Sequence, residues 1–162
     1  MTIVVLNRRN LIAAGGSVLA AGVAGLSVPA GAVGLAPTPS MSGGSNNYRK
    51  GAPIVERIGK GGFWMSGTVR RAGDGAPLAG QRIQIWAHTP EGQEHEPQSH
   101  GATLTDKNGM FRLEIPQIIP IFGQPHGHLA YDSGEFKTVF LRPVMRSAKE
   151  TKLEAHFVLQ PV

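Results

Sequence analysis

Two histidines separated by a single residue, His126 and His128, are the part of this chain best suited to do chemistry. They lie in the stretch Pro125-His126-Gly127-His128-Leu129, late in a region rich in β-forming residues. Side chains alternate between the two faces of a strand, so both imidazoles are expected on one face, roughly 6–7 Å apart along it. Paired imidazoles on one face of a sheet suit a non-haem metal. We therefore predict that these two histidines are metal ligands.

A polar, histidine-rich segment at residues 88–100 offers further candidates. A metal held by two histidines needs more nitrogen or oxygen ligands and open coordination positions, which suits Fe(II), Cu(II) or Zn(II). The alternative is a solvated surface loop, in which histidines and glutamates are exposed and bind nothing. We predict further metal ligands and acid–base groups in this segment. The predicted ligands are His88, Glu94 and His95, and the predicted catalytic residues are His88 and His100.

The elements that would position these residues are short strands. Several segments alternate apolar and polar residues or carry β-branched and aromatic residues, and glycine- and asparagine-rich turns separate them. No segment with helical periodicity is long enough to compete with them. The expected strands cover residues 63–69, 82–86, 102–105, 110–115, 126–131, 136–141 and 154–159. We predict an all-β fold, a single sandwich of seven to eight strands.

The N-terminal 32 residues are typical of an export signal. Residues 7–10 read Asn-Arg-Arg-Asn, a twin-arginine pattern, and residues 12–28 form an uncharged run rich in alanine and glycine. Residues 30–32, Ala-Gly-Ala, offer a small-x-small cleavage site. The alternative is an uncleaved membrane anchor, but the run is weakly hydrophobic and interrupted by glycines. We predict a periplasmic or secreted protein that uses the twin-arginine route, with no stable membrane insertion after cleavage.

The rest of the chain divides into two parts by composition. Residues 33–62 are rich in proline, glycine, serine and asparagine and are predicted to be a flexible tether, and residues 63–162 are predicted to be one domain. The chain has no cysteine, which excludes disulfides and thiolate metal sites. Its net charge of +5 comes from scattered lysines and arginines, so we expect no nucleic-acid partner.

Four segments, in order along the chain, resemble the core of the intradiol ring-cleavage dioxygenases, a family that includes the catechol and protocatechuate 3,4-dioxygenases. Residues 67–69 read Gly-Thr-Val, residues 75–86 read Gly-Ala-Pro-Leu-Ala-Gly-Gln-Arg-Ile-Gln-Ile-Trp, and residues 105–111 read Thr-Asp-Lys-Asn-Gly-Met-Phe. The His-x-His pair follows at the expected distance. The turn segments alone also occur in transthyretin-like carriers, and the tryptophan strand and the histidine pair add specificity. The resemblance covers residues 64–159 and implies a sandwich of the same type.

The resemblance also implies a ferric iron site held by two tyrosines and two histidines. The two histidines correspond to His126 and His128, but the tyrosine positions hold Glu94 and Ile119. The two tyrosines of the chain are Tyr131, which is expected on the opposite strand face from the histidine pair, and one in the predicted tether. The chain therefore departs from the family at the metal ligands.

The function predicted from these observations is an exported, metal-dependent oxidoreductase that acts on a phenolic or other aromatic compound with O2. Its cofactor is predicted to be non-haem iron, with copper or zinc as alternatives, and the resemblance extends to assembly as a homo-oligomer. The competing prediction is a non-catalytic module on the same scaffold that binds metal, carbohydrate or protein. A structural carrier-like domain is a third alternative. Trp64 and Trp86 are predicted to lie in the core, with stacking on an aromatic substrate as the alternative, and His156 is predicted to be a structural histidine.

Overall fold

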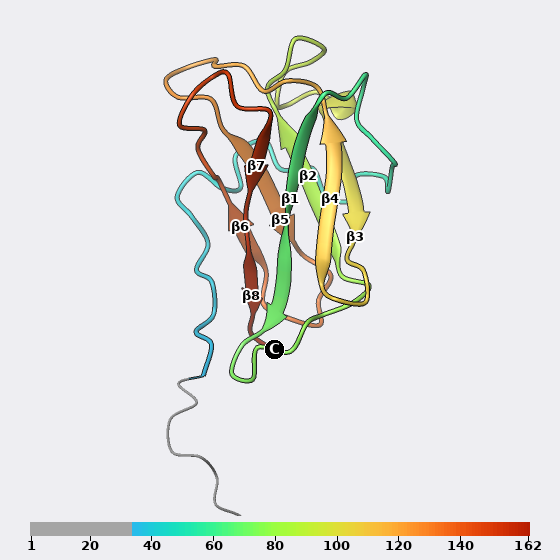
Figure 1. Cartoon of the computed structure of the whole chain (residues 1–162), viewed down its shortest axis with the longest axis vertical. Helices are drawn as coiled ribbons and strands as arrows, with labels where there is room; N and C mark the ends of the chain where they lie inside the picture. Colours follow the sequence, from blue (N-terminus) through green and yellow to red (C-terminus); the bar gives the residue numbers. More distant parts are fainter. Residues whose placement is uncertain (1–33) are drawn as a thin grey trace, which may run out of the picture. The chain divides into compact units, whose positions relative to one another are not determined.

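The structure, a computed structural model, describes residues 34–162 and consists of two β-sheets packed face to face (Figure 1). The predicted signal peptide at residues 1–32 lies outside the described residues. The first sheet has the order β4-β1-β7, and β8 also pairs with β1; the second has the order β3-β2-β5-β6. The elements are β1 (Phe63–Arg71), β2 (Arg82–Ala87), the short 3-10 helix η1 (Pro97–Ser99), β3 (His100–Leu104), β4 (Met110–Ile115), β5 (Gly127–Tyr131), β6 (Val139–Leu141), β7 (Lys152–Glu154) and β8 (Phe157–Leu159). The predicted all-β sandwich of seven to eight strands is confirmed.

The last predicted strand, residues 154–159, is divided into the end of β7 and β8. Both pair in parallel with β1, at Met65↔Leu153 and Val69↔Phe157. Between them the Ala155 amide donates to the Ser66 carbonyl (3.0 Å). A Cβ on Gly67 would overlap the carbonyl oxygen of Ala155, so only glycine permits this close approach of the two backbones.

The core lies between the two sheets and is filled by aliphatic and aromatic side chains. Along β1 burial alternates strictly: Phe63, Met65 and Val69 are buried, whereas Trp64 is 38% exposed on the outer face. Each large apolar side chain that is fully buried contributes about 1.5–3 kcal/mol to folding relative to an exposed one. This inner face fixes the register of the sheet, since a slip by one residue would turn every buried side chain outward.

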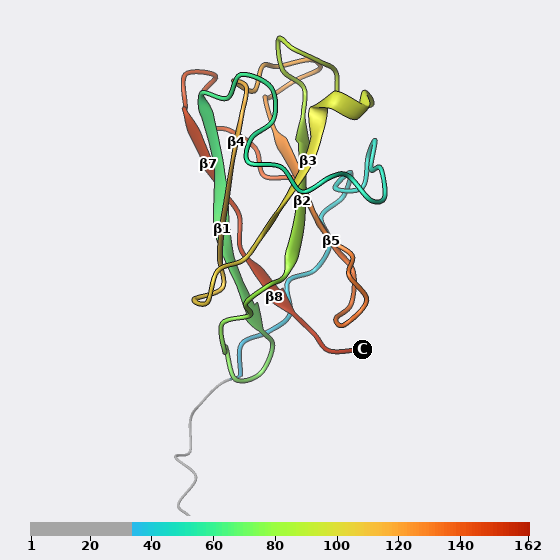
Figure 2. The ribbon, with the colours of Figure 1, turned by 90° about the vertical axis from the view of Figure 1, so that its right-hand side faces the viewer.

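In the second sheet, β2 and β5 are buried on both faces. The reason is that the chain before β1 lies along this sheet, as Figure 2 shows for the blue and cyan segment. The Met41 amide donates to the Phe140 carbonyl (2.8 Å), and the Val55 amide donates to the Ala102 carbonyl (3.0 Å). We call residues 41–49 the strap. The described part of the predicted tether is therefore docked on the sandwich, which corrects its interpretation as a flexible segment.

Candidate metal centre

Three aromatic rings lie side by side on the outer face of the second sheet, under the strap. Trp86 on β2 is directly opposite His100 on β3 and His128 on β5. The indole is stacked on both imidazoles, with ring centroids 5.5 Å from His100 and 5.1 Å from His128 and interplanar angles of 10° and 9°. Trp86 and His128 have no exposed surface. The ring of His128 is therefore fixed in place by packing against the tryptophan.

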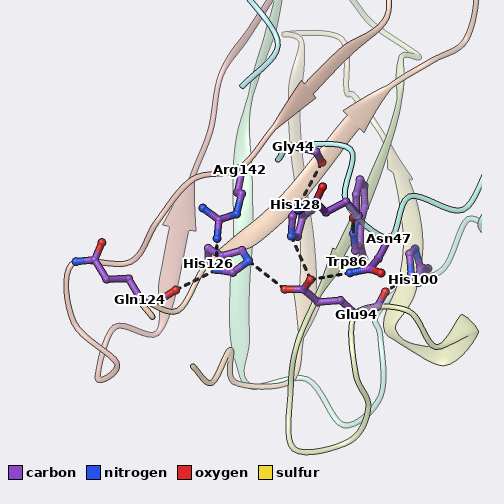
Figure 3. A network of polar contacts seen from close by, with 10 residues as sticks. Gly44, Asn47, Trp86, Glu94, His100, Gln124, His126, His128 and Arg142 are labelled. Carbon is purple, nitrogen blue, oxygen red and sulfur yellow. Dashed lines mark hydrogen bonds and ion pairs between the residues drawn. The ribbon is translucent and has the colours of Figure 1, made fainter. Parts of the chain in front are cut away.

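Glu94, His126 and His128 point toward one another beside this row of stacked rings (Figure 3). His128 is in β5, His126 immediately precedes that strand, and Glu94 comes from the loop between β2 and η1. The Nε2 atom of His126 lies 3.1 Å from Glu94 Oε1, and the Nε2 atom of His128 lies 3.5 Å from Glu94 Oε2. All three candidate ligand atoms are within 4.8 Å of one another. The strand alternation predicted for the two histidines places them as expected, on one face.

Both histidines of the cluster contact backbone carbonyl oxygens through Nδ1. The Nδ1 atom of His126 lies 2.9 Å from the Gln124 carbonyl oxygen, and that of His128 lies 3.1 Å from the Gly44 carbonyl oxygen. A carbonyl oxygen only accepts, so the Nδ1 atom of His128 carries the proton that is donated, and the lone pair of the neutral ring is on Nε2. The Nδ1 atom of His126 lies between an acceptor, the Gln124 carbonyl, and a donor, the Arg142 guanidinium (3.2 Å), and the Nε2 atoms of both histidines face the Glu94 carboxylate.

Two polar atoms in this cluster are buried without a hydrogen-bond partner, Glu94 Oε1 and His128 Nε2. Their nearest polar neighbours are the other members of the cluster, in the contacts of 3.1 and 3.5 Å given above. A buried polar atom without a partner costs about 1–3 kcal/mol. Metal–ligand bonds of about 2.0–2.2 Å bring neighbouring ligand atoms to roughly 3 Å from each other, close to the separations found in this cluster. The donor atoms therefore fit a divalent metal.

The charges of the cluster also suit a cation. Burial raises the pKa of the Glu94 carboxyl, but His126 and His128 outweigh this effect and hold that pKa below its usual range. The Glu94 carboxylate in turn raises the pKa of His126, against the lowering effect of burial. The carboxylate is thus anionic, and it favours the protonated form of His126. A metal competes with that proton for the imidazole lone pair.

His100, a predicted catalytic residue, supports the cluster without joining it. Its Nε2 atom donates to the backbone carbonyl of Glu94 (2.6 Å), and its Nδ1 atom accepts from the Gln84 side chain (3.3 Å). Burial lowers the pKa of His100, which keeps the ring neutral for these two bonds. The side chain therefore holds the Glu94 backbone in place, and both ring nitrogens have hydrogen-bond partners. A catalytic role for His100 stays a prediction.

The structure does not bring the other two predicted histidines to the cluster. Within residues 34–162, the convergent acidic and histidine side chains are the three described above. His88 is half-buried, and its backbone carbonyl accepts from the Ile119 amide (3.1 Å). His95 is exposed. The polar loop thus contributes one candidate ligand, Glu94, to the cluster, and His88 and His95 lie outside it.

Neither tyrosine belongs to the cluster. Tyr48, in the strap, packs its ring against Trp86 and Phe140 (centroids 5.7 and 5.0 Å apart), and its hydroxyl donates to the Asp132 carboxylate. Tyr131 is buried in the core against Phe136. A ferric site with two tyrosinate ligands therefore does not fit these residues, whereas two imidazoles and one carboxylate do.

Several contact residues of the site could not be found from the sequence. Gly44 and Gln124 contribute backbone carbonyl oxygens, Asn47 donates its amide to Glu94 Oε2 (3.1 Å), and the Arg142 guanidinium lies 3.2 Å from His126 Nδ1. Backbone acceptors carry no signal in residue type. The contact of Asn47 also joins segments far apart in the chain, so no local pattern marks it.

No family model and no curated protein sequence matches this chain. Solved structures do. Hydroxyquinol 1,2-dioxygenase from Pseudomonas putida DLL-E4 has a TM-score of 0.59 at 11% identity, over 79% of this chain and 68% of that one. The dioxygenase domain of a dioxygenase carbohydrate-binding protein fusion from Streptomyces sp. SirexAA-E has a TM-score of 0.59 at 16% identity, over 78% of this chain and 100% of that one. Chlorocatechol 1,2-dioxygenase from Pseudomonas putida has a TM-score of 0.51 at 20% identity, over 70% and 68%.

At these identities the likeness concerns the fold. The chain has the sandwich of the catechol-type 1,2-dioxygenases, and the resemblance noted in the sequence is confirmed at that level. Within that sandwich the site holds a glutamate beside two histidines.

Within residues 34–162, no helix has the length and apolar character needed to cross a bilayer.

Proposed function

We propose that this chain is a metal-dependent oxidoreductase that acts on a phenolic or other aromatic compound with O2. The observation that carries the proposal is the convergence of Glu94, His126 and His128, with the Nε2 atoms of both histidines facing the same carboxylate. Two imidazoles and one carboxylate with open positions are the donor set typical of non-haem Fe(II) oxygenases. Copper and zinc also accept these donors, so iron is the first metal to test and the other two follow.

The structural neighbours support an aromatic substrate. By their names, two of them act on hydroxyquinol and chlorocatechol as 1,2-dioxygenases, and a third is a dioxygenase domain. Sharing a fold does not transfer an activity, so the substrate class rests on the site as well. The Arg142 guanidinium, 3.2 Å from His126 Nδ1, adds a positive charge that favours an anionic phenolate nearby.

In this proposal His126, His128 and Glu94 hold the metal, which when bound would supply the Lewis acidity and the redox chemistry with O2. The residues of the chain itself position these ligands. Trp86 fixes the plane of His128 by stacking, and His100 fixes the backbone of Glu94. The Gly44 carbonyl keeps the Nδ1 proton of His128 in place and its Nε2 atom available.

A second candidate function, a non-catalytic metal-binding module, is favoured by one specific observation. The relative exposures of the three ligand residues are 0% for His128, 7% for His126 and 9% for Glu94. Structural and carrier sites are closed in this way, whereas a catalytic site keeps a position open to its substrate. The two functions differ in turnover, because both require metal and only the first consumes O2.

Export by the twin-arginine route and assembly as a homo-oligomer are part of the same proposal. Export is supported by the twin-arginine pattern at residues 7–10. Fractionation of cells that express the full chain would test export, because a cytoplasmic, uncleaved product argues against it.

The test of the function is oxygen consumption. The purified full chain, reconstituted anaerobically with Fe(II), is placed in an oxygen-electrode cell with hydroxyquinol, catechol or chlorocatechol. We expect O2 uptake that depends on the aromatic compound and is lost in Glu94→Gln. Bound metal without O2 uptake for any of these compounds would favour the non-catalytic module, and a protein that binds no metal would contradict both functions.

A further inference from the structure

The metal centre is completed by the strap, which lies outside both sheets. The Gly44 carbonyl accepts from His128 Nδ1 (3.1 Å), although the two residues are 84 positions apart. The Asn47 amide donates to Glu94 Oε2 (3.1 Å), and the Asn46 carbonyl accepts from Trp86 Nε1 (2.9 Å). Two of the three ligands and the ring that stacks on one of them are therefore held from this segment (Figure 3).

The backbone of the strap is shaped for this close approach. A Cβ on Gly44 would lie 2.8 Å from the Phe140 carbonyl oxygen and 2.9 Å from its carbon, so a larger residue would push the strap away from the sheet. Gly43 and Asn47 both have positive φ, 70° and 57°. Among the described residues Asn47 is the one non-glycine residue with positive φ, and asparagine is among the few residues that tolerate it. From this position in the strap, the Asn47 amide reaches Glu94.

We propose that Asn47 is a positioning residue of the metal centre and that docking of the strap completes the ligand set. The amide holds Glu94 Oε2, which leaves Oε1, an atom without a hydrogen-bond partner, as the ligand. The Gly44 carbonyl holds the Nδ1 proton of His128 and so keeps its Nε2 lone pair available. This inference rests on the metal binding of the proposed function. By linkage, a metal that needs the docked strap also stabilises that docked state.

The first test compares metal affinity in two strap variants of the full chain. Asn47→Gly keeps the positive φ accessible and removes the amide, and Ser45→Ala is the control, because Ser45 is exposed and no side-chain hydrogen bond is found for it. Co(II) and Zn(II) are titrated in competition with a chromophoric chelator. We expect Asn47→Gly to weaken binding about 10- to 100-fold and to change the visible spectrum of bound Co(II), as for loss of an outer-shell partner. Ser45→Ala should match the wild type.

The second test follows the strap itself by hydrogen exchange. We expect bound Zn(II) to slow exchange of the Gly44 and Asn46 amides, which donate within the strap to Met41 and Gly43 (3.0 and 3.2 Å). Unchanged affinity and an unchanged Co(II) spectrum in Asn47→Gly would overturn the positioning role, even if the variant melts at a lower temperature. Exchange that does not respond to Zn(II) would overturn the coupling to docking. A wild-type chain that binds neither metal would instead remove the proposed function itself.

Discussion

The two sheets of this sandwich differ in what covers their outer faces. On the first sheet Ser66, Thr68 and Arg112 face outward and remain open or half-open to solvent. On the second sheet the outward residues Gln84 and His128 are fully buried, because the strap lies across them. Polar residues on an uncovered sheet are solvated, whereas the same residue types under a cover must satisfy one another or a ligand. The presence of the strap, rather than the residue types, distinguishes the outer faces of the two sheets.

The histidines of the two sheets differ in the same way, in their burial and in their hydrogen-bond partners. His156, beyond the end of β7, is exposed, and its Nδ1 atom shares a hydrogen bond of 3.0 Å with the Thr68 hydroxyl. This agrees with its prediction as a structural histidine. His126 and His128 are buried beside a buried carboxylate, and a ring nitrogen of His128 lacks a hydrogen-bond partner. The contrast predicts where substitution should matter and where it should not.

The largest effect on stability is expected at the buried tryptophan. Trp86→Ala removes a fully buried ring that contacts His100, His128 and Tyr48 and should lower the free energy of unfolding by about 3–5 kcal/mol. The matched variant is Trp64→Ala on the open face, where the ring is 38% exposed under the Arg112 guanidinium, and it should cost about 1 kcal/mol or less. Urea unfolding of both variants measures the difference. Equal losses would show that the two faces are not distinguished by burial.

The next effect is the loss of metal from the covered face. Glu94→Gln keeps the size of the side chain and removes the charge, so affinity for Zn(II) should fall by more than about 100-fold. This is more than the loss typical for a residue that only hydrogen-bonds to a metal ligand. His156→Ala, on the other sheet, should leave affinity unchanged. Competition titration gives both values. A large loss in His156→Ala would place metal binding on the open face.

The smallest effect is expected from the hydrogen bond of the open face. Thr68→Val removes the hydroxyl that contacts His156 and should lower the free energy of unfolding by about 0.5–1.5 kcal/mol, with metal content unchanged. Thermal or urea unfolding with and without Zn(II) separates the two readouts. A change in metal content in this variant would show that a substitution on the open face affects metal binding under the strap, and would contradict the expected independence of the two faces.

The strands were predictable because burial on the inner face leaves a period-two pattern in the sequence, as along β1. The break between β7 and β8 was not, because it depends on the contact of Gly67 with Ala155, which are far apart in the chain. The docked strap was also missed. Its contacts use mainly backbone atoms, so a composition rich in glycine, serine and proline predicted a tether where the structure has a cover.

The site was predictable in part for a related reason. Strand alternation alone brings His126 and His128 to one face. The polar segment at residues 88–100 limits the candidates for a third ligand to a few residues. Which residue of that loop turns inward depends on the bond from His100 to the Glu94 carbonyl and on the Asn47 amide, neither of which leaves a local pattern. His88, His95 and Glu94 are therefore equally good candidate ligands in the sequence, and in the structure only Glu94 lies beside the histidine pair.

The central claim is that two histidines and a glutamate, with no tyrosine, hold the metal. The most direct measurement is the metal content of the full chain, purified without chelator and reconstituted with Fe(II), together with its visible spectrum in air. We predict about one metal per chain and no tyrosinate charge-transfer band, because both tyrosines are engaged elsewhere. A broad tyrosinate band, or no bound metal after reconstitution, would contradict the claim.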